Sequence, residues 1–150
     1  MSSSTTVVRP ESPEAAIAAF GSGEGVTVLG GGTVLMPEIN YGHQKVETAL
    51  ILAHAGLDYV RENGDGITVG AMTSLSEAVR LPDPMGSVAA AIADLEIRRQ
   101  ATVGGNICAP RGIGDLQAAL IACGAMVRST GSGGERVEPI EDFLINRRDR

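Results

Sequence analysis

The sequence is poor in aromatic residues, lysine, cysteine and histidine. It has no tryptophan, two tyrosines and two phenylalanines. Lys45 is its single lysine and does not follow a glycine, so the Gly-Lys-Ser/Thr end of a P-loop is absent and P-loop NTPase activity is excluded. Cys108 and Cys123, together with His43 and His54, match no zinc or iron–sulfur ligand spacing. We therefore expect no metal centre in this chain and two reduced, structural cysteines.

Long apolar runs and a basic leader are also missing. No segment reaches the roughly 18 consecutive apolar residues of a membrane span, and residues 1–6 lack the basic start of a secretion signal. A soluble cytoplasmic protein is the expectation. The 12 basic residues stand against 18 acidic ones, and the net charge is −6 with no basic cluster. Binding to a nucleic-acid backbone is therefore not expected.

Glycine is the residue in surplus. The chain has 20 glycines among 150 residues, about twice the usual share. With 43% apolar and 20% charged residues, the composition is otherwise that of a compact globular protein. The surplus suggests a fold that needs unusual backbone conformations or close backbone contacts more than it needs aromatic bulk.

Residues up to about 56 predict a small β-α-β unit. Ser12 precedes a proline and an apolar pattern, which indicates a helix over residues 13–20 capped by Ser12. The run Val26–Leu29 is typical of a buried strand, a short helical turn is expected over 33–36, and Thr48–Leu52 predicts a second strand. Together they form a first lobe.

From residue 57 the pattern changes to a hairpin followed by helices. The turn residues Asn63-Gly64-Asp65-Gly66 separate two strand candidates, and a capping box at Ser74–Glu77 predicts a helix start. One helix is expected over 87–97 and another over 114–122. A strand over 125–129 with a return over 136–140 completes a second lobe. The whole chain is thus expected to be α+β.

The first candidate site lies where a predicted strand enters Gly30-Gly31-Gly32-Thr33. Glycine lets a ligand come close to the backbone, and successive N–H groups facing a concavity bind phosphate oxygens. A pyrophosphate fits such a loop, although the same residues are also typical of a plain tight turn. Leu35 stands where the fingerprint G-x-G-x-x-G has its last glycine, so a nicotinamide Rossmann domain is not expected.

The second candidate site is the segment Thr102-Val103-Gly104-Gly105-Asn106. Its Thr and Asn side chains can donate hydrogen bonds beside two exposed glycine N–H groups, and Asp115 can accept from a ribose hydroxyl. Gly112 and Gly114 are expected to shape the approach to Asp115. Donors and an acceptor together suit a nucleotide, whereas Gly-Gly-Asn alone is also typical of a turn.

Several segments, in this order, resemble the FAD-binding domain of the molybdenum hydroxylase family, which includes xanthine dehydrogenase and the flavoprotein subunits of carbon monoxide dehydrogenase. They are Val28–Leu35, Ile67–Thr73, Ala101–Ile107, Gly114–Leu120 and Val137–Leu144. The resemblance implies an α+β, two-lobed FAD-binding fold with lobe 1 over residues 1–56 and lobe 2 over 57–150.

The resemblance also implies a cofactor site. The FAD pyrophosphate would be held by the first segment, consisting of Val28, Leu29, Gly30, Gly31, Gly32, Thr33, Val34 and Leu35. The second segment would clamp it from the other lobe through Thr102, Val103, Gly104, Gly105 and Asn106. Asp115 would meet the ribose or nearby polar atoms. No residue of this chain is expected to act as an acid, a base or a nucleophile, because the redox chemistry belongs to the cofactor.

Partners follow from the same resemblance. A molybdopterin subunit would hydroxylate the substrate, an iron–sulfur subunit with [2Fe–2S] clusters would relay electrons, and FAD in this chain would pass them to an external acceptor. No nucleic acid and no membrane are expected as partners. Family subunits continue past the last matching segment, so lobe 2 is expected to be incomplete at its C-terminal end and the C-terminal flavoprotein domain to be absent.

Two alternatives remain open from the sequence. One is a stand-alone flavin oxidoreductase with the same two-lobed cradle. The other is a non-catalytic remnant that no longer retains FAD, which Val34 favours because family members usually carry an acidic residue at that place. We interpret His54 as a hydrogen-bonded or half-exposed histidine and not as a catalytic base, because no carboxylate partner is marked nearby.

Overall fold

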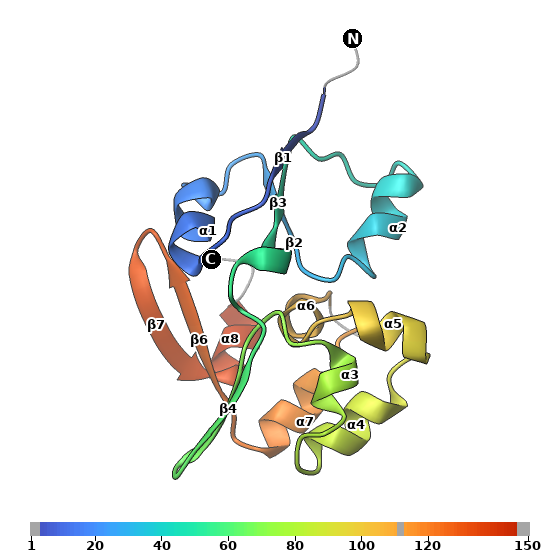
Figure 1. Cartoon of the computed structure of the whole chain (residues 1–150), viewed down its shortest axis with the longest axis vertical. Coiled ribbons are helices and arrows are strands. Elements are labelled where there is room, and N and C mark those ends of the chain that lie inside the picture. Colours follow the sequence, from blue (N-terminus) through green and yellow to red (C-terminus); the bar gives the residue numbers. More distant parts are fainter. Residues whose placement is uncertain (1–3, 111–112, 147–150) are drawn as a thin grey trace.

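The computed structural model describes residues 4–110 and 113–146. Figure 1 shows two lobes, one built from the first part of the chain around a small sheet and one from all later elements. Along the chain, the elements are β1 (Thr6–Val8), α1 (Pro13–Phe20), β2 (Val26–Leu29), α2 (Leu35–Asn40), β3 (Thr48–Ile51), the 3₁₀ turn η1 (Leu52–His54), β4 (Val60–Asn63), β5 (Gly66–Val69), α3 (Leu75–Ala78), α4 (Met85–Ala91), α5 (Leu95–Gln100), α6 (Val103–Cys108), α7 (Leu116–Ala122), β6 (Met126–Gly131), β7 (Gly134–Pro139) and α8 (Ile140–Asn146).

The first lobe is a three-stranded parallel sheet in the order β1-β3-β2. Its helix α1 begins as predicted, because the Ser12 side chain accepts a hydrogen bond from the Ala15 N–H and proline occupies the first helical position. The strands predicted at 26–29 and 48–52 are confirmed, the second one ending at Ile51. Strand β1 was not predicted, because its three residues are too few to give a periodic signal.

The second lobe combines two separate hairpins with a helical cluster. The predicted hairpin forms as β4–β5, and the capping box at the start of α3 has both of its reciprocal hydrogen bonds, between Ser74 and Glu77. The predicted strand and its return form the hairpin β6–β7. The core of the second lobe consists of apolar side chains from the segment between α3 and α7, namely Leu75, Ala78, Met85, Ala89, Ala101, Val103, Leu116 and Ala119.

The single helix predicted over 87–97 is wrong, because the chain breaks there into α4 and α5. Ile92 is extended and Ala93 has a positive φ of 47°, which a continuous helix does not allow. Asp94 then caps α5 by accepting from the Ile97 N–H. Arg98 donates to the carbonyl oxygens of both Ile92 and Ala93, so the carbonyls released at the break find a partner.

Within residues 4–110 and 113–146, no helix is both long and apolar enough to cross a membrane.

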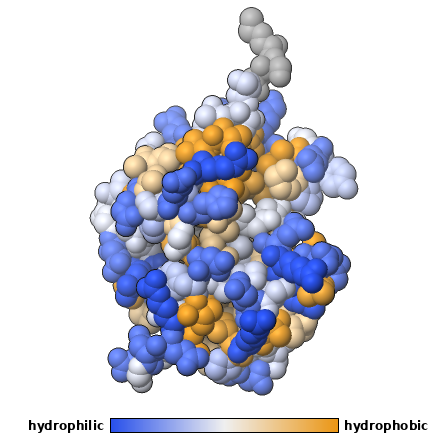
Figure 2. All heavy atoms as spheres, viewed as in Figure 1, coloured by the Kyte–Doolittle hydropathy of each residue, from blue (hydrophilic) through white to orange (hydrophobic). Residues whose placement is uncertain are grey.

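Figure 2 shows apolar surface gathered on the first lobe in this view, and Val7 and Val28 are among the exposed hydrophobic side chains of that lobe. Parallel sheets are normally covered on both faces. Here α1 packs on β3, whereas α2 is a short helix of six residues.

Candidate functional site

The first glycine loop lies at the carboxyl edge of the parallel sheet, on the side of the first lobe that faces α5 and α6 (Figure 1). It follows β2 directly, and Gly32 has a positive φ of 72°, a conformation that favours glycine. The Gly32 carbonyl then accepts from the Met36 N–H as α2 begins. Ligands of open parallel sheets bind outside the carboxyl ends of the strands, which is where this loop lies.

Backbone donors are available in this loop. In the described part of the chain, the N–H groups of Gly31, Gly32, Thr33 and Val34 donate no hydrogen bond to another residue. These residues are half-buried except for Val34, which is exposed. A run of N–H groups without internal partners at the end of a strand can serve oxygen atoms of an anion. The loop therefore fits the pyrophosphate that the sequence predicts here.

The second glycine segment is a helix and not a turn. Thr102 is its N-cap, with the side-chain oxygen accepting from the Gly105 N–H at 3.1 Å, and α6 follows. The Asn106 N–H bonds to the Thr102 carbonyl. The start of α6 was not predicted from the sequence, because two successive glycines disfavour a helix.

The expectation of exposed glycine N–H groups in this second segment is wrong. The Val103 N–H donates to the Thr73 carbonyl, and the Gly104 N–H donates to the Ala71 carbonyl at 2.8 Å. With Gly105 bonded to the Thr102 hydroxyl, every N–H from 103 to 106 has a partner within the protein. Gly104 is glycine for a packing reason, because a Cβ there would lie 2.8 Å from the Cβ of Ala71.

The structure brings the two glycine segments into contact. A Cβ built on Gly30 would lie 2.9 Å from the Thr102 hydroxyl oxygen. A Cβ built on Gly31 would overlap the Gln100 carbonyl oxygen and would lie 3.0 Å from the Ala101 Cα. Both segments were predicted to surround one ligand, but Gln100 and Ala101 were not part of the prediction, because their backbone atoms carry no sequence signal.

Asn106 and its neighbours connect α6 to α7. The Asn106 side-chain oxygen accepts from the Leu116 N–H at 3.0 Å, and the Gln117 side chain donates to the Asn106 and Ile107 carbonyls. Gly114 is also required by packing, since a Cβ there would collide with Gln117 and the Asn106 carbonyl. Gly112 lies outside the described residues. The side-chain amide of Asn106 thus has a structural task through its oxygen.

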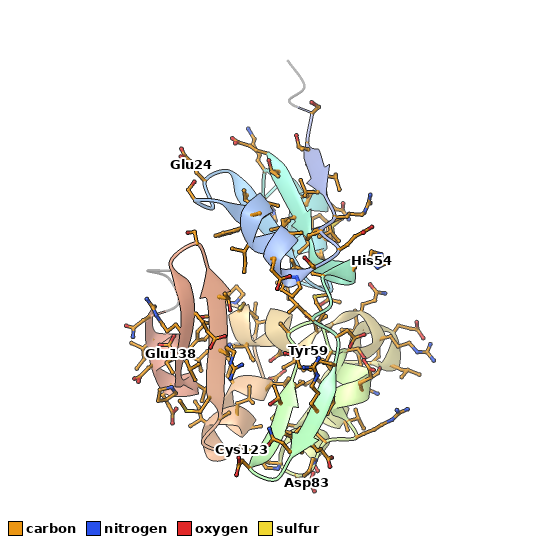
Figure 3. All side chains as sticks on the ribbon, turned by 60° about the vertical axis from the view of Figure 1, so that its left-hand side comes forward. Glu24, His54, Tyr59, Asp83, Cys123 and Glu138 are labelled. Carbon is orange, nitrogen blue, oxygen red and sulfur yellow. The ribbon has the colours of Figure 1, made fainter. Side chains whose placement is uncertain are left out.

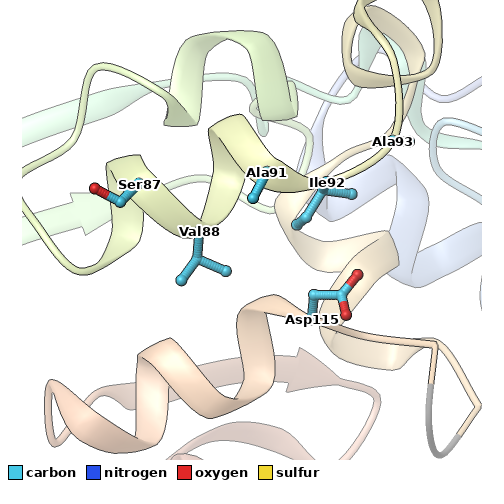
Figure 4. Close-up of a pocket in the computed structure, with 6 residues that line it drawn as sticks. All are labelled: Ser87, Val88, Ala91, Ile92, Ala93 and Asp115. Carbon is cyan, nitrogen blue, oxygen red and sulfur yellow. The ribbon is translucent and has the colours of Figure 1, made fainter.

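Asp115 lies at the start of α7 and lines an open groove with residues of α4 and the following break (Figure 4). Its side chain does not cap the helix. Within the described residues, the carboxylate accepts no hydrogen bond and is exposed. Of the described residues that line this groove, Asp115 is the one with an acidic side chain, and the others are Ser87, Val88, Ala91, Ile92 and Ala93. An exposed carboxylate of this kind can accept from a hydroxyl group.

One titratable group near this groove has a displaced pKa. The Ser87 hydroxyl and the Ser87 N–H both donate to the Asp83 carboxylate, and these bonds lower the pKa of Asp83 below its ordinary value of 3.8. Asp83 stabilises the start of α4 in this way, and Figure 3 shows it at the end of the second lobe far from His54.

The remaining candidates for chemistry have structural or surface positions. His54 is exposed and its side chain makes no hydrogen bond to any described residue, which agrees with its interpretation as a histidine outside the catalytic chemistry. Cys108 and Cys123 are both exposed and form no disulfide. In the described ranges, no cluster of three or more His, Cys, Asp or Glu side chains could hold a metal ion.

Comparisons with known proteins place the chain among FAD-binding proteins. The sequence model of one family, described as the FAD binding domain in molybdopterin dehydrogenase, matches residues 3–150. The chain is 32% identical over 146 residues to caffeine dehydrogenase subunit beta of Pseudomonas sp. (strain CBB1), covering 91% of this chain and 50% of that protein. It is 29% identical over 145 residues to the carbon monoxide dehydrogenase medium chain of Hydrogenophaga pseudoflava, covering 91% and 50%.

A solved structure has the same fold. Reconstituted CO dehydrogenase from Oligotropha carboxidovorans matches with a TM-score of 0.86 and 28% identity, over 93% of this chain and 51% of that chain. The chain therefore spans about half the length of the relatives that it matches.

Proposed function

The chain belongs to the family of FAD-binding domains of molybdopterin dehydrogenases, and on that premise we propose that it is the flavin-binding part of an electron-transfer subunit. Its cofactor is FAD, and the α+β, two-lobed fold expected from the sequence is confirmed by the solved relative. The observation that carries the proposal is the run of N–H groups from Gly31 to Val34, at the carboxyl edge of the sheet, that have no partner among the described residues.

We propose that this loop holds the FAD pyrophosphate, with Val28 and Leu29 ending the strand that presents it and Leu35 starting the helix after it. The segment 102–106 would support the cofactor from the second lobe. Because its backbone N–H groups are already used, the donor that it would offer is the side-chain NH₂ of Asn106. Asp115 would accept from a hydroxyl group of FAD. The boundary between the lobes is proposed at residues 56 and 57.

FAD bound here would supply two-electron and one-electron redox chemistry. This chain's own residues would bind and orient the cofactor. In a molybdenum hydroxylase complex, the electrons would come from [2Fe–2S] clusters of a partner subunit, downstream of a molybdopterin subunit, and would leave to an external acceptor. Membership of such a heteromeric complex, and a cytoplasmic location, are part of the proposal and rest on the family.

The test is flavin binding by the purified chain. FAD should bind and give an absorption band near about 450 nm, whereas riboflavin, which has no phosphate groups, should bind far more weakly. ADP should compete with FAD because it carries the same pyrophosphate. Equal binding of FAD and riboflavin would contradict the phosphate loop. A chain that stays colourless and that FAD does not stabilise against heat would favour the remnant that no longer retains FAD.

A further inference from the structure

The contact between the two glycine segments is a backbone seam between the lobes. We define the seam as Gly30–Gly31 on one side and Gln100–Thr102 on the other. A Cβ built on Gly31 would overlap the carbonyl oxygen of Gln100 and would lie 2.6 Å from the carbonyl carbon of that residue. Ordinary van der Waals contact begins near 3.4 Å. Gly31 does not have a positive φ, so no backbone strain explains the glycine. The reason for glycine at 31 is the proximity of the other lobe.

Neither side of the seam can give way locally. Ala101 is buried, its N–H bonds to the Ile97 carbonyl, and its own carbonyl accepts from the Leu75 N–H at 2.9 Å. On the other side, Gly31 follows β2, whose last residue Leu29 is registered with Ile51 in the sheet. An added Cβ at position 31 therefore meets backbone atoms that are fixed within their own lobes, and it must move one lobe relative to the other.

Packing between helices and strands of the two lobes is slight. In the described ranges, no helix or strand of the first lobe packs extensively against one of the second, apart from such short contacts as the seam. The covalent connection between the lobes runs from η1 to β4. Inter-domain contacts of small area allow relative motion unless a specific contact fixes them.

We infer that Gly31 is the positioning residue that sets the distance between the two lobes, and through it the width of the FAD site. This inference rests on the proposed function, since it assumes that the cofactor spans both lobes. Its physical content is independent of phosphate binding: the missing side chain of Gly31 faces the Gln100 carbonyl, so what a Cβ there displaces first is the second lobe. Gly31 thus acts through lobe spacing.

The experiment measures lobe spacing without any cofactor. Spin labels are placed at exposed positions of each lobe through Tyr41→Cys and Glu96→Cys, in a chain with Cys108→Ser and Cys123→Ser. In the Gly31→Ala variant, the distance between the labels should become longer by about 1 Å or more, or distinctly broader, because the overlap has to be relieved. FAD affinity should fall by about tenfold or more, since a widened site loses contacts on one side.

A matched control separates this effect from that of any new methyl group. Gly64→Ala adds the same atom in a hairpin turn where nothing lies within 4 Å of the new Cβ, and it should change neither quantity. An unchanged label distance in Gly31→Ala would overturn the inference. If the unmodified chain fails to bind FAD, the proposed function fails, but the label distance still decides whether Gly31 sets the lobe spacing.

A second variant covers the case in which Gly31→Ala does not fold. Gly30→Ala opposes a side-chain oxygen, that of Thr102, so it should lengthen the label distance less. Trimming the opposing side chain in Gly30→Ala/Thr102→Ala should return the distance to that of Thr102→Ala alone, as a double-mutant cycle requires for residues in contact. Additive effects of the two substitutions would show that the seam does not transmit the contact and would overturn the inference.

Discussion

Thr102→Ala is the most informative single test of the second glycine segment. Thr102 is 4% exposed, caps α6 through the bond from the Gly105 N–H, and contacts Gly30 across the seam. If the segment were a solvent-exposed phosphate turn, removing its hydroxyl would change cofactor binding and leave the stability of the free chain nearly unchanged. If the segment is a capped helix buried against the core, the stability of the free chain must fall.

The expected loss follows from two contributions. Replacing an N-cap threonine by alanine costs about 1 kcal/mol, within a range of roughly 0.5–2 kcal/mol. Removing its buried methyl group costs about 1 kcal/mol more. Thr102→Ala should therefore lower the free energy of unfolding by about 2 kcal/mol, which corresponds to a fall in Tm of about 4–8 °C for a chain of this size.

The matched control is Thr102→Ser, which keeps the capping oxygen and removes only the methyl group. It should lose about 1 kcal/mol, half the effect of the alanine variant. Both are measured by urea unfolding of the FAD-free chain, followed by far-UV circular dichroism. Equal losses in the two variants would refute the reasoning, because the hydrogen bond to Gly105 would then contribute nothing to stability.

Three further predictions concern the second lobe. Leu116→Ala should lower the free energy of unfolding by about 3 kcal/mol because Leu116 is fully buried. Ile121→Ala, on the exposed part of α7, should lower it by less than about 1 kcal/mol. Urea unfolding of the two variants measures both losses. Asn106→Ala should destabilise the chain by about 1 kcal/mol through the loss of the bond to the Leu116 N–H, and Asn106→Asp, which keeps the acceptor, should lose less; a similar loss in both would exclude that bond as the cause. The pKa of Asp83 is lowered in the folded chain, so the carboxylate stabilises the fold above its ordinary pKa of 3.8, and this stabilisation is lost as the pH falls through the lower folded pKa. Ser87→Ala should raise the pKa of Asp83, measured by NMR titration. An unchanged titration would contradict the assigned cause.

Local features of the fold could be read from the sequence because their signals come from neighbouring residues. Ser12 caps α1 three residues ahead of its donor, and the reciprocal bonds of Ser74 and Glu77 start α3. The hairpin β4–β5 forms around the predicted turn residues. The first glycine loop was located correctly at the end of β2 for the same reason, since a strand followed by three glycines is a local pattern.

The helix break after α4 was not predicted, although Asp94 caps the new helix as locally as Ser12 caps α1. Alanine-rich sequence favours a continuous helix by propensity. The break is stabilised by Asp94 at the new helix start and by Arg98, which reaches back to the carbonyls of Ile92 and Ala93. These bonds outweigh a weak intrinsic preference, so the second helix begins at Leu95.

The sequence by itself determined the family, and through the family the FAD cofactor, because several segments match in order along the chain. It also determined the places of both glycine segments, whose residues are adjacent in the chain. Only the tertiary structure decided what each segment can do. The N–H groups of Val103 and Gly104 donate to the carbonyls of Thr73 and Ala71, which are distant in sequence, whereas those of Gly31 to Val34 donate to none of the residues that the structure describes. A backbone N–H can bind a ligand only when folding gives it no partner within the protein. Whether it has such a partner depends on how segments distant in the sequence pack together.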